Sequence, residues 1–103
     1  MAAQPDYQFE TTCINALMEG GVYGLTITRE AAEGMRRAEV NICDVSYVLI
    51  NGHVVQSDML EDRGLWSVRG PTVDDVVLQL TVAVETTEYD VELLRVFVVE
   101  RNG

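Results

Sequence analysis

Three side chains in the second half of the chain are the strongest candidates for chemistry: Arg69, Arg95 and His53. A guanidinium presents a planar fork of donors that matches an anion, and an imidazole can carry a proton near neutral pH. The alternative for the two arginines is structural. An Arg within a strand needs a partner, and a neighbouring carboxylate such as Glu85 or Asp75 could supply it. For His53, the only histidine, the alternative is a surface position at the start of a strand.

One short segment combines three acidic residues closely enough to suggest a metal site: Asp58, Glu61 and Asp62. A calcium loop needs alternating oxygen ligands and a turn glycine, and this segment does not have that pattern. We therefore expect a solvated turn from Asp58 to Gly64 and no metal. The chain also has no Gly-rich phosphate loop, Gly-x-Ser-x-Gly elbow or Cys-x-x-Cys pair, so we expect no cofactor.

The cellular compartment is predicted from two features of the sequence. Cys13 and Cys43 are too few for a disulfide framework or a four-ligand zinc site, and we expect reduced thiols packed as small apolar side chains. No apolar run approaches the roughly 20 residues that span a bilayer, and the first ten residues do not resemble a signal peptide. We expect a cytoplasmic protein with no membrane partner.

The chain is strongly acidic. Seventeen acidic residues face seven basic ones, which gives a net charge of −10, and all seven basic residues are Arg. Such a field repels phosphate backbones, so we do not expect direct nucleic-acid binding. One explanation is solubility or adaptation to a salty host. The other is a surface that imitates a phosphate backbone and binds a basic protein partner, for which the candidate residues are Asp58, Glu61, Asp62, Asp74, Asp75, Glu88 and Asp90.

The elements that must position these residues form one domain over residues 1–103, helical over about 6–52 and sheet-forming over about 53–100. The first helix is predicted from Asp6 to Met18, with Gly20-Gly21 after it. Its apolar residues recur at helical spacing, at Phe9, Cys13, Ile14 and Leu17.

Two more helices are predicted after a short extended segment from Val22 to Ile27. Thr28 can cap the first of them, and Asn41 can cap the second, which Gly52 closes. We expect the inner faces of these two helices to consist of Ala31, Ala32 and Met35 in the first, and Val45, Val48 and Leu49 in the second.

From His53 onward the apolar period changes to two, which predicts four strands. Their approximate ranges are His53 to Ser57, Leu65 to Arg69, Asp75 to Glu85 and Glu92 to Glu100. In the third strand, one face is apolar and consists of Val76, Leu78, Leu80, Val82 and Val84. In the fourth, we expect Leu94, Val96 and Val98 to share one face.

The positions of the apolar residues in the last two strands predict the register in which these strands pair as a hairpin. Pairing Val82 with Leu94, Leu80 with Val96 and Leu78 with Val98 places all six apolar side chains on one face, whereas a slip by one residue would not. The same register places Arg95 opposite Thr81 and Phe97 opposite Gln79 on the other face. We therefore expect one apolar face that holds the helices and one polar face with a guanidinium.

The two middle helices carry a resemblance to a known family. The chain from Glu30 reads Glu30-Ala31-x-x-Gly34-Met35-x-x-Ala38-Glu39-Val40-Asn41-x-x-Asp44-Val45, followed by Asn51-Gly52 and a strand. This resembles the frame H-A-x-x-R-M-x-x-R-G-I-s-x-x-D-V, then N-G and a strand, of small bacterial and phage proteins of unknown function that are likened to RelE-type toxins. The resemblance covers roughly Leu25 to Glu100. It implies a RelE-like α+β fold, with N-terminal helices on one face of a mainly antiparallel four-stranded sheet.

The residues that depart from that frame argue against ribonuclease activity of the RelE type. The His of the frame falls on Glu30, and its two Arg positions fall on Gly34 and Ala38. In RelE-like ribonucleases, basic and proton-transferring side chains act on the scissile phosphate, and these three residues cannot do so. Arg36 and Arg37 are not replacements, because a shift of one or two positions turns a side chain by roughly 100° or 200° on a helix.

Three hypotheses follow. We favour a non-catalytic, acidic protein-binding module, in the manner of phage-borne inhibitors that act on nucleic-acid-handling complexes such as CRISPR surveillance assemblies. The second is a RelE-like RNase toxin that uses Arg69, Arg95 and His53. The third is a structural homo-oligomer, a homodimer for example, whose sheet edges pair between subunits.

Overall fold

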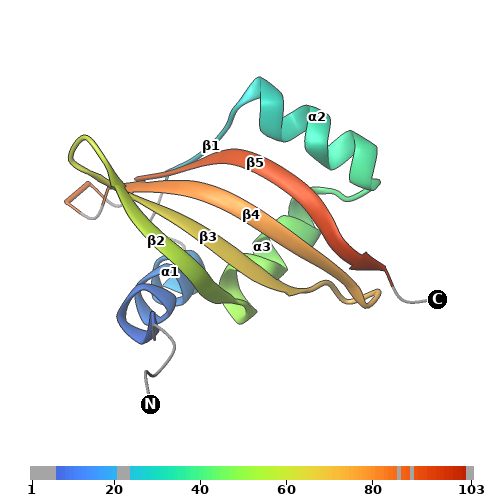
Figure 1. Ribbon diagram of the computed structural model, residues 1–103, viewed down its shortest axis with the longest axis horizontal. Coiled ribbons are helices and arrows are strands. Elements are labelled where there is room, and N and C mark those ends of the chain that lie inside the picture. The colour runs from blue at the N-terminus through green and yellow to red at the C-terminus, as the bar shows by residue number, and fades with distance from the viewer. Residues whose placement is uncertain (1–6, 21–23, 86, 89, 102–103) are drawn as a thin grey trace, which may run out of the picture.

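The computed structural model describes residues 7–20, 24–85, 87–88 and 90–101, and these form an α+β fold (Figure 1). Three helices and a five-stranded mixed sheet follow one another as α1 (Gln8–Gly20), β1 (Gly24–Ile27), α2 (Arg29–Ala38), α3 (Ile42–Asn51), β2 (His53–Leu60), β3 (Arg63–Pro71), β4 (Val76–Glu85) and β5 (Asp90–Arg101). No helix among the described residues is long and apolar enough to cross a membrane.

The sheet has the order β1-β5-β4-β3-β2. Strands β2 to β5 pair antiparallel with their neighbours, and β1 pairs parallel with β5. The predicted α+β class is therefore confirmed, but the sheet has a strand more than the four predicted. The additional strand belongs to the segment that we expected to be extended, and it pairs with Asp90 to Leu93. Residues 22 and 23 of that segment lie outside the described residues.

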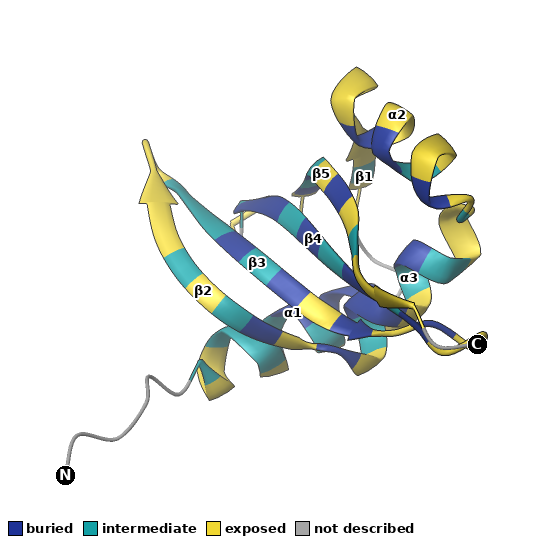
Figure 2. Cartoon of the chain, turned by 45° about the vertical axis from the view of Figure 1, so that its right-hand side comes forward, coloured by how far each residue is buried: buried dark blue, intermediate teal, exposed yellow. Residues whose placement is uncertain are grey.

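The helices occupy two different places. Helices α1 and α3 pack against each other and cover one face of the sheet, with α3 over β3 and α1 over β2 (Figure 2). Helix α2 instead lies along the outer edge of β5, where β1 has ended. The core forms between the covered face and the helices, and its largest fully enclosed side chains are Ile14, Val45, Val48, Leu49, Val68, Leu78, Leu80, Val82, Val84, Val91 and Leu93.

Both predicted helix caps are confirmed. The side chain of Thr28 accepts a hydrogen bond from the backbone N–H of Ala31 at 3.2 Å. Asn41 and Asp44 form a reciprocal capping box, in which each side chain accepts from the other residue's backbone N–H at 3.0 Å. These bonds satisfy amide groups that have no partner within the first turn of a helix. Gly52 follows α3 as predicted.

The inner faces of the first two helices differ from the prediction. Phe9 is 78% exposed, whereas Ile14, Leu17 and Met18 are the buried residues of α1. In α2, Ala32 is exposed, whereas Ala31, Gly34 and Ala38 are buried. Helix α2 packs against the backbone at the edge of β5. Its buried positions are therefore occupied by its smallest residues and not by its most apolar ones. The start predicted for the first helix, Asp6, lies outside the described residues.

The β2–β3 hairpin is longer than predicted. The two strands extend to Leu60 and from Arg63, so that the turn consists of Glu61 and Asp62 alone. Asp58 therefore lies within β2, opposite Leu65, and not in a turn from Asp58 to Gly64. In the sequence, the alternation of apolar and polar residues ends at Ser57. In the structure, the strand continues because backbone pairing with β3 does not depend on the polarity of the side chains.

The predicted β4–β5 register is correct over one half of the hairpin. Leu80 lies opposite Val96 and Leu78 opposite Val98, as expected. A β-bulge after Thr81 then shifts the register, so Val82 lies opposite Leu93 instead of Leu94. A bulge places two residues of one strand against one of the other, and the faces of the strand exchange beyond it. Leu93 is consequently enclosed in the core, and Leu94 is half-buried.

Candidate functional site

The three candidates for chemistry lie on the face of the sheet that α1 and α3 leave open. His53 lies opposite Arg69, which lies opposite Gln79 in the next strand. Arg95 lies opposite Thr81, one side-chain step along the sheet. Two strand spacings and one two-residue step separate the Cα atoms of Arg69 and Arg95 by about 12 Å. The sheet therefore brings all three residues to one face without bringing the two arginines into contact.

The partners of the two arginines are not the carboxylates that we expected. The Nε and Nη2 atoms of Arg69 both donate to Oε1 of Gln79, at 3.1 and 2.7 Å. The Nε atom of Arg95 donates to Oε2 of Glu30 at 3.1 Å, from β5 to α2. Cross-strand pairing supplies the first partner, and the position of α2 beside β5 supplies the second. The Arg95–Glu30 pair is largely exposed, so it contributes little to stability.

The residues that align with the His and Arg positions of the frame that the segment resembles all lie against β5. A Cβ atom added at Gly34 would collide with the carbonyl oxygen of Val96. Ala38 is 5% exposed on the same side of α2. Glu30 holds Arg95. An Arg at position 34 would therefore require α2 to move away from β5.

Carboxylates gather where the β2–β3 and β4–β5 turns meet. In an antiparallel meander, alternate turns lie at the same end of the sheet, and both of these turns lie on the left of Figure 1. We call this region the acidic end and define it by Asp58, Glu61, Asp62, Glu85, Glu88, Asp90 and Glu92. Five of these were predicted as partner-binding residues. The sequence analysis missed Glu85 and Glu92, although each borders a predicted hairpin turn.

One hollow of the acidic end has a volume of about 380 Å³ and combines four carboxylates with Arg63. The Nη1 atom of Arg63 lies 2.9 Å from Oε1 of Glu92, across the sheet. The other three carboxylates that line this hollow are Glu85, Glu88 and Asp90. Within the described ranges, no three His, Cys, Asp or Glu side chains are arranged to hold a metal ion.

The remaining two predicted partner-binding residues lie elsewhere. Asp74 and Asp75 belong to the β3–β4 turn, which is at the opposite end of the sheet. That turn is organised by Thr72, whose hydroxyl accepts from the backbone N–H groups of Asp74 and Val76 at 3.3 Å. The structure therefore divides the predicted set into two groups that one compact partner surface would not contact together.

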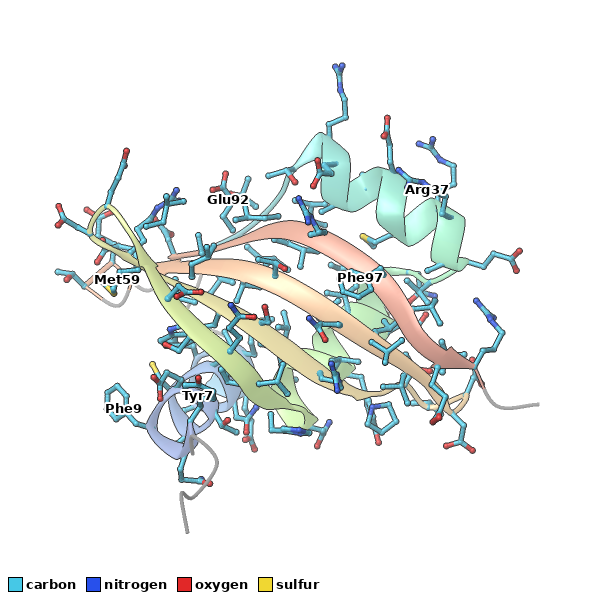
Figure 3. All side chains as sticks on the ribbon, in the orientation of Figure 1. Tyr7, Phe9, Arg37, Met59, Glu92 and Phe97 are labelled. Carbon is cyan, nitrogen blue, oxygen red and sulfur yellow. The ribbon has the colours of Figure 1, made fainter. Side chains whose placement is uncertain are left out.

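Exposed apolar side chains accompany the acidic end. Met59 is 71% exposed near the tip of the β2–β3 hairpin, and Leu60 is 42% exposed beside it. Phe9 projects from α1 on the same side of the molecule (Figure 3). Phe9 and Met59 line a common groove with Trp66. Aromatic and sulfur-containing side chains within a charged rim are typical of protein-binding surfaces.

The two cysteines are free, but they do not share one environment. Cys13 is partly buried on α1, and burial raises the pKa of its thiol, with a smaller contribution from the charge of Glu10. Cys43 is exposed on α3, so the prediction of a packed small side chain is wrong for this residue. It occupies the second position of α3, on the side away from Val45 and Val48, which the apolar spacing could have indicated.

Comparison with known proteins assigns no function to this surface. No family model, no curated protein and no solved structure matches the chain.

Proposed function

We propose that this protein is a non-catalytic, acidic protein-binding module whose acidic end binds a basic surface of another protein. Its action would be inhibitory: the carboxylates occupy a groove that otherwise holds a nucleic-acid backbone. The partner class follows from charge, because a field of this sign attracts Arg- and Lys-rich surfaces and repels phosphates.

The observation that carries the proposal is the separation of charge within the molecule. The acidic end holds seven carboxylates with Arg63 as its one cation, and Arg63 is already paired with Glu92. The other six arginines of the chain lie elsewhere, on α2, on the open face and at the end of β5. Solubility alone needs a net charge but no such separation, whereas recognition of a basic partner needs carboxylates in one place.

The proposal is tested with two variants of equal charge and a partner captured by cross-linking in the native host. The acidic-end variant carries Glu61→Gln, Asp62→Asn, Glu88→Gln and Asp90→Asn. The control carries Glu39→Gln, Asp74→Asn, Asp75→Asn and Glu100→Gln. We expect the first variant to bind the purified partner at least about tenfold more weakly, with a flatter salt dependence between about 50 and 500 mM.

The control variant should keep most of the affinity, because its four substitutions lie away from the acidic end. Equal losses in the two variants would mean that net charge alone governs binding. Unchanged affinity in both would contradict an electrostatic interface at either end of the sheet.

A second candidate is a RelE-like ribonuclease, which the resemblance of the middle helices implies. The observation in its favour is that Arg69, Arg95 and His53 share the open face of the sheet. Against it, Arg69 is held by Gln79 and Arg95 by Glu30. Expression of the wild type should halt growth if this candidate is correct, and Arg95→Ala should relieve the arrest. Normal growth would eliminate it.

A further inference from the structure

The two edges of the sheet differ in how they are protected. The edge at β5 is closed first by β1 and then by α2, which lies along the rest of that strand. The opposite edge is β2, and within the described part of the chain β2 pairs with β3 alone. A strand with one unpaired side presents a row of backbone donors and acceptors to another chain.

Only the first half of β2 is covered. There the hydroxyl of Thr11, on α1, accepts a hydrogen bond from the backbone N–H of Val54 at 2.9 Å, and a bulge interrupts the register next to it. The second half, from Ser57 to Leu60, contains neither a bulge nor a Pro or Lys. Proteins commonly use these features, and charged side chains, to keep an edge strand from pairing. The one charged side chain here is Asp58, which opposes an acidic chain but attracts a basic one, so this half remains competent for addition of a basic strand.

A groove runs beside this half of β2, on the side of the sheet that carries the helices. It has a volume of about 280 Å³ and lies between α1 and the β2–β3 hairpin. Phe9 and Met59 line it with Trp66, whose indole lies directly over Gly64. Trp66 itself is 5% exposed, so its indole forms the floor of the groove and the more exposed Phe9 and Met59 form the sides.

Arg63, on the other face of the hairpin, is paired with Glu92, and the two charged residues that line the groove are both acidic. Glu10 and Asp62 line it, and Asp58 projects from the other face of β2. A second copy of this chain, paired through the same edge, would bring these carboxylates against their equivalents, which costs free energy. A positively charged segment would instead be attracted. Charge complementarity thus selects a basic partner over self-association.

We propose that the acidic end binds an extended basic segment of its partner by strand addition to Ser57–Leu60. This inference rests on the proposed function and specifies how that function is performed. Successive side chains of a strand point to opposite faces, so the segment should alternate apolar with basic residues. Its apolar side chains enter the groove beside Met59 and Trp66, and its basic side chains lie beside Asp58.

The probe is a fluorescent ten-residue peptide that alternates Arg with Val, and its binding is measured by anisotropy. Two further peptides carry backbone N-methyl groups on all the arginines or on all the valines. The N–H groups of alternate residues point to the same side of a strand, so only one of these two sets can face β2. We expect one methylated peptide to bind like the parent and the other to lose binding. Equal binding of the two methylated peptides would overturn strand addition.

Two protein variants with equal charge changes locate the site of binding. Asp58→Asn with Asp62→Asn should weaken binding of the parent peptide roughly tenfold, whereas Asp74→Asn with Asp75→Asn should change it less than about twofold. Sedimentation should show a monomer in the absence of peptide. A dimer would mean that a second copy of this chain, and not a basic segment, pairs with β2.

The outcomes separate this inference from the proposed function. If Asp58→Asn with Asp62→Asn weakens binding but both methylated peptides bind equally, basic docking stands and strand addition is wrong. If neither pair of substitutions affects binding, both proposals are wrong.

Discussion

At the scale of single residues, Gly34 shows how the same position can be interpreted in two ways. In the sequence, it aligns with an arginine of the frame that this segment resembles, which suggested a loss of catalytic residues. In the structure, it is the point at which α2 contacts the backbone of β5, beside the carbonyl oxygen of Val96. The sequence contained a signal for this contact, because Ala31, Gly34 and Ala38 are small residues at helical spacing. The prediction from hydrophobicity assigned Ala32 and Met35 to the inner face of this helix instead. Contact with a backbone depends on the size of a side chain more than on its apolar character.

The contact predicts that Gly34→Ala destabilises the protein. Alanine is the better helix former by about 1 kcal/mol, so an exposed position would gain stability. At Gly34 the added methyl group would collide with β5, and we expect a net loss of about 1–3 kcal/mol in the free energy of unfolding, measured by urea denaturation. Ala32→Gly, at an exposed position of the same helix, reports the propensity alone and should cost about 1 kcal/mol. A stabilised Gly34→Ala variant would show that α2 does not lie on β5 in this way.

Among the helices and strands, local sequence signals were reliable wherever a single residue type determines the backbone conformation. Thr28 and Asn41 were identified as caps from their side chains alone, and both form the expected hydrogen bonds. The bulge in β5 could not be identified in the same way. Leu93 and Leu94 are identical in type, so apolar alternation does not distinguish which of them faces the core. Pairing with β4 and contact with the helices determine which of the two leucines is buried.

The end of α2 gives a prediction at this scale. Glu39 has a φ of 59°, in the left-handed region, and the backbone N–H of Val40 donates to the carbonyl of Met35 at 3.0 Å. Glycine is the usual residue at this position. We expect Glu39→Gly to raise the free energy of unfolding by about 1 kcal/mol.

Glu39→Gln is the matched control, because it removes the same charge and keeps the side chain. It should change stability by no more than about 0.5 kcal/mol in the same urea titration. If the two variants were equally stabilised, relief of charge repulsion would be the cause, and not the left-handed backbone.

At the scale of the whole molecule, topology determines which carboxylates act together. The pairing of β1 with β5 joins residues more than 60 positions apart in the chain, and no local pattern indicates it. The division of the acidic residues was more predictable. In a meander of four strands, the first and third turns share an end, which separates Asp74 and Asp75 from Glu61 and Glu88. Net charge alone, without an assignment of each turn to an end of the sheet, does not separate these residues.

Carboxylate labelling of the complex shows whether the acidic end is the surface in contact with the partner. The protein is treated with a carbodiimide and an amine, free and bound, and the rate of labelling at each Asp and Glu is measured by mass spectrometry. We predict that Glu61, Asp62, Glu88 and Asp90 react several-fold more slowly in the complex, because a bound basic surface excludes the reagent. Asp74 should react at the same rate in both states. Protection at Asp74, with unchanged rates at the acidic end, would mean that the partner binds the opposite end of the sheet.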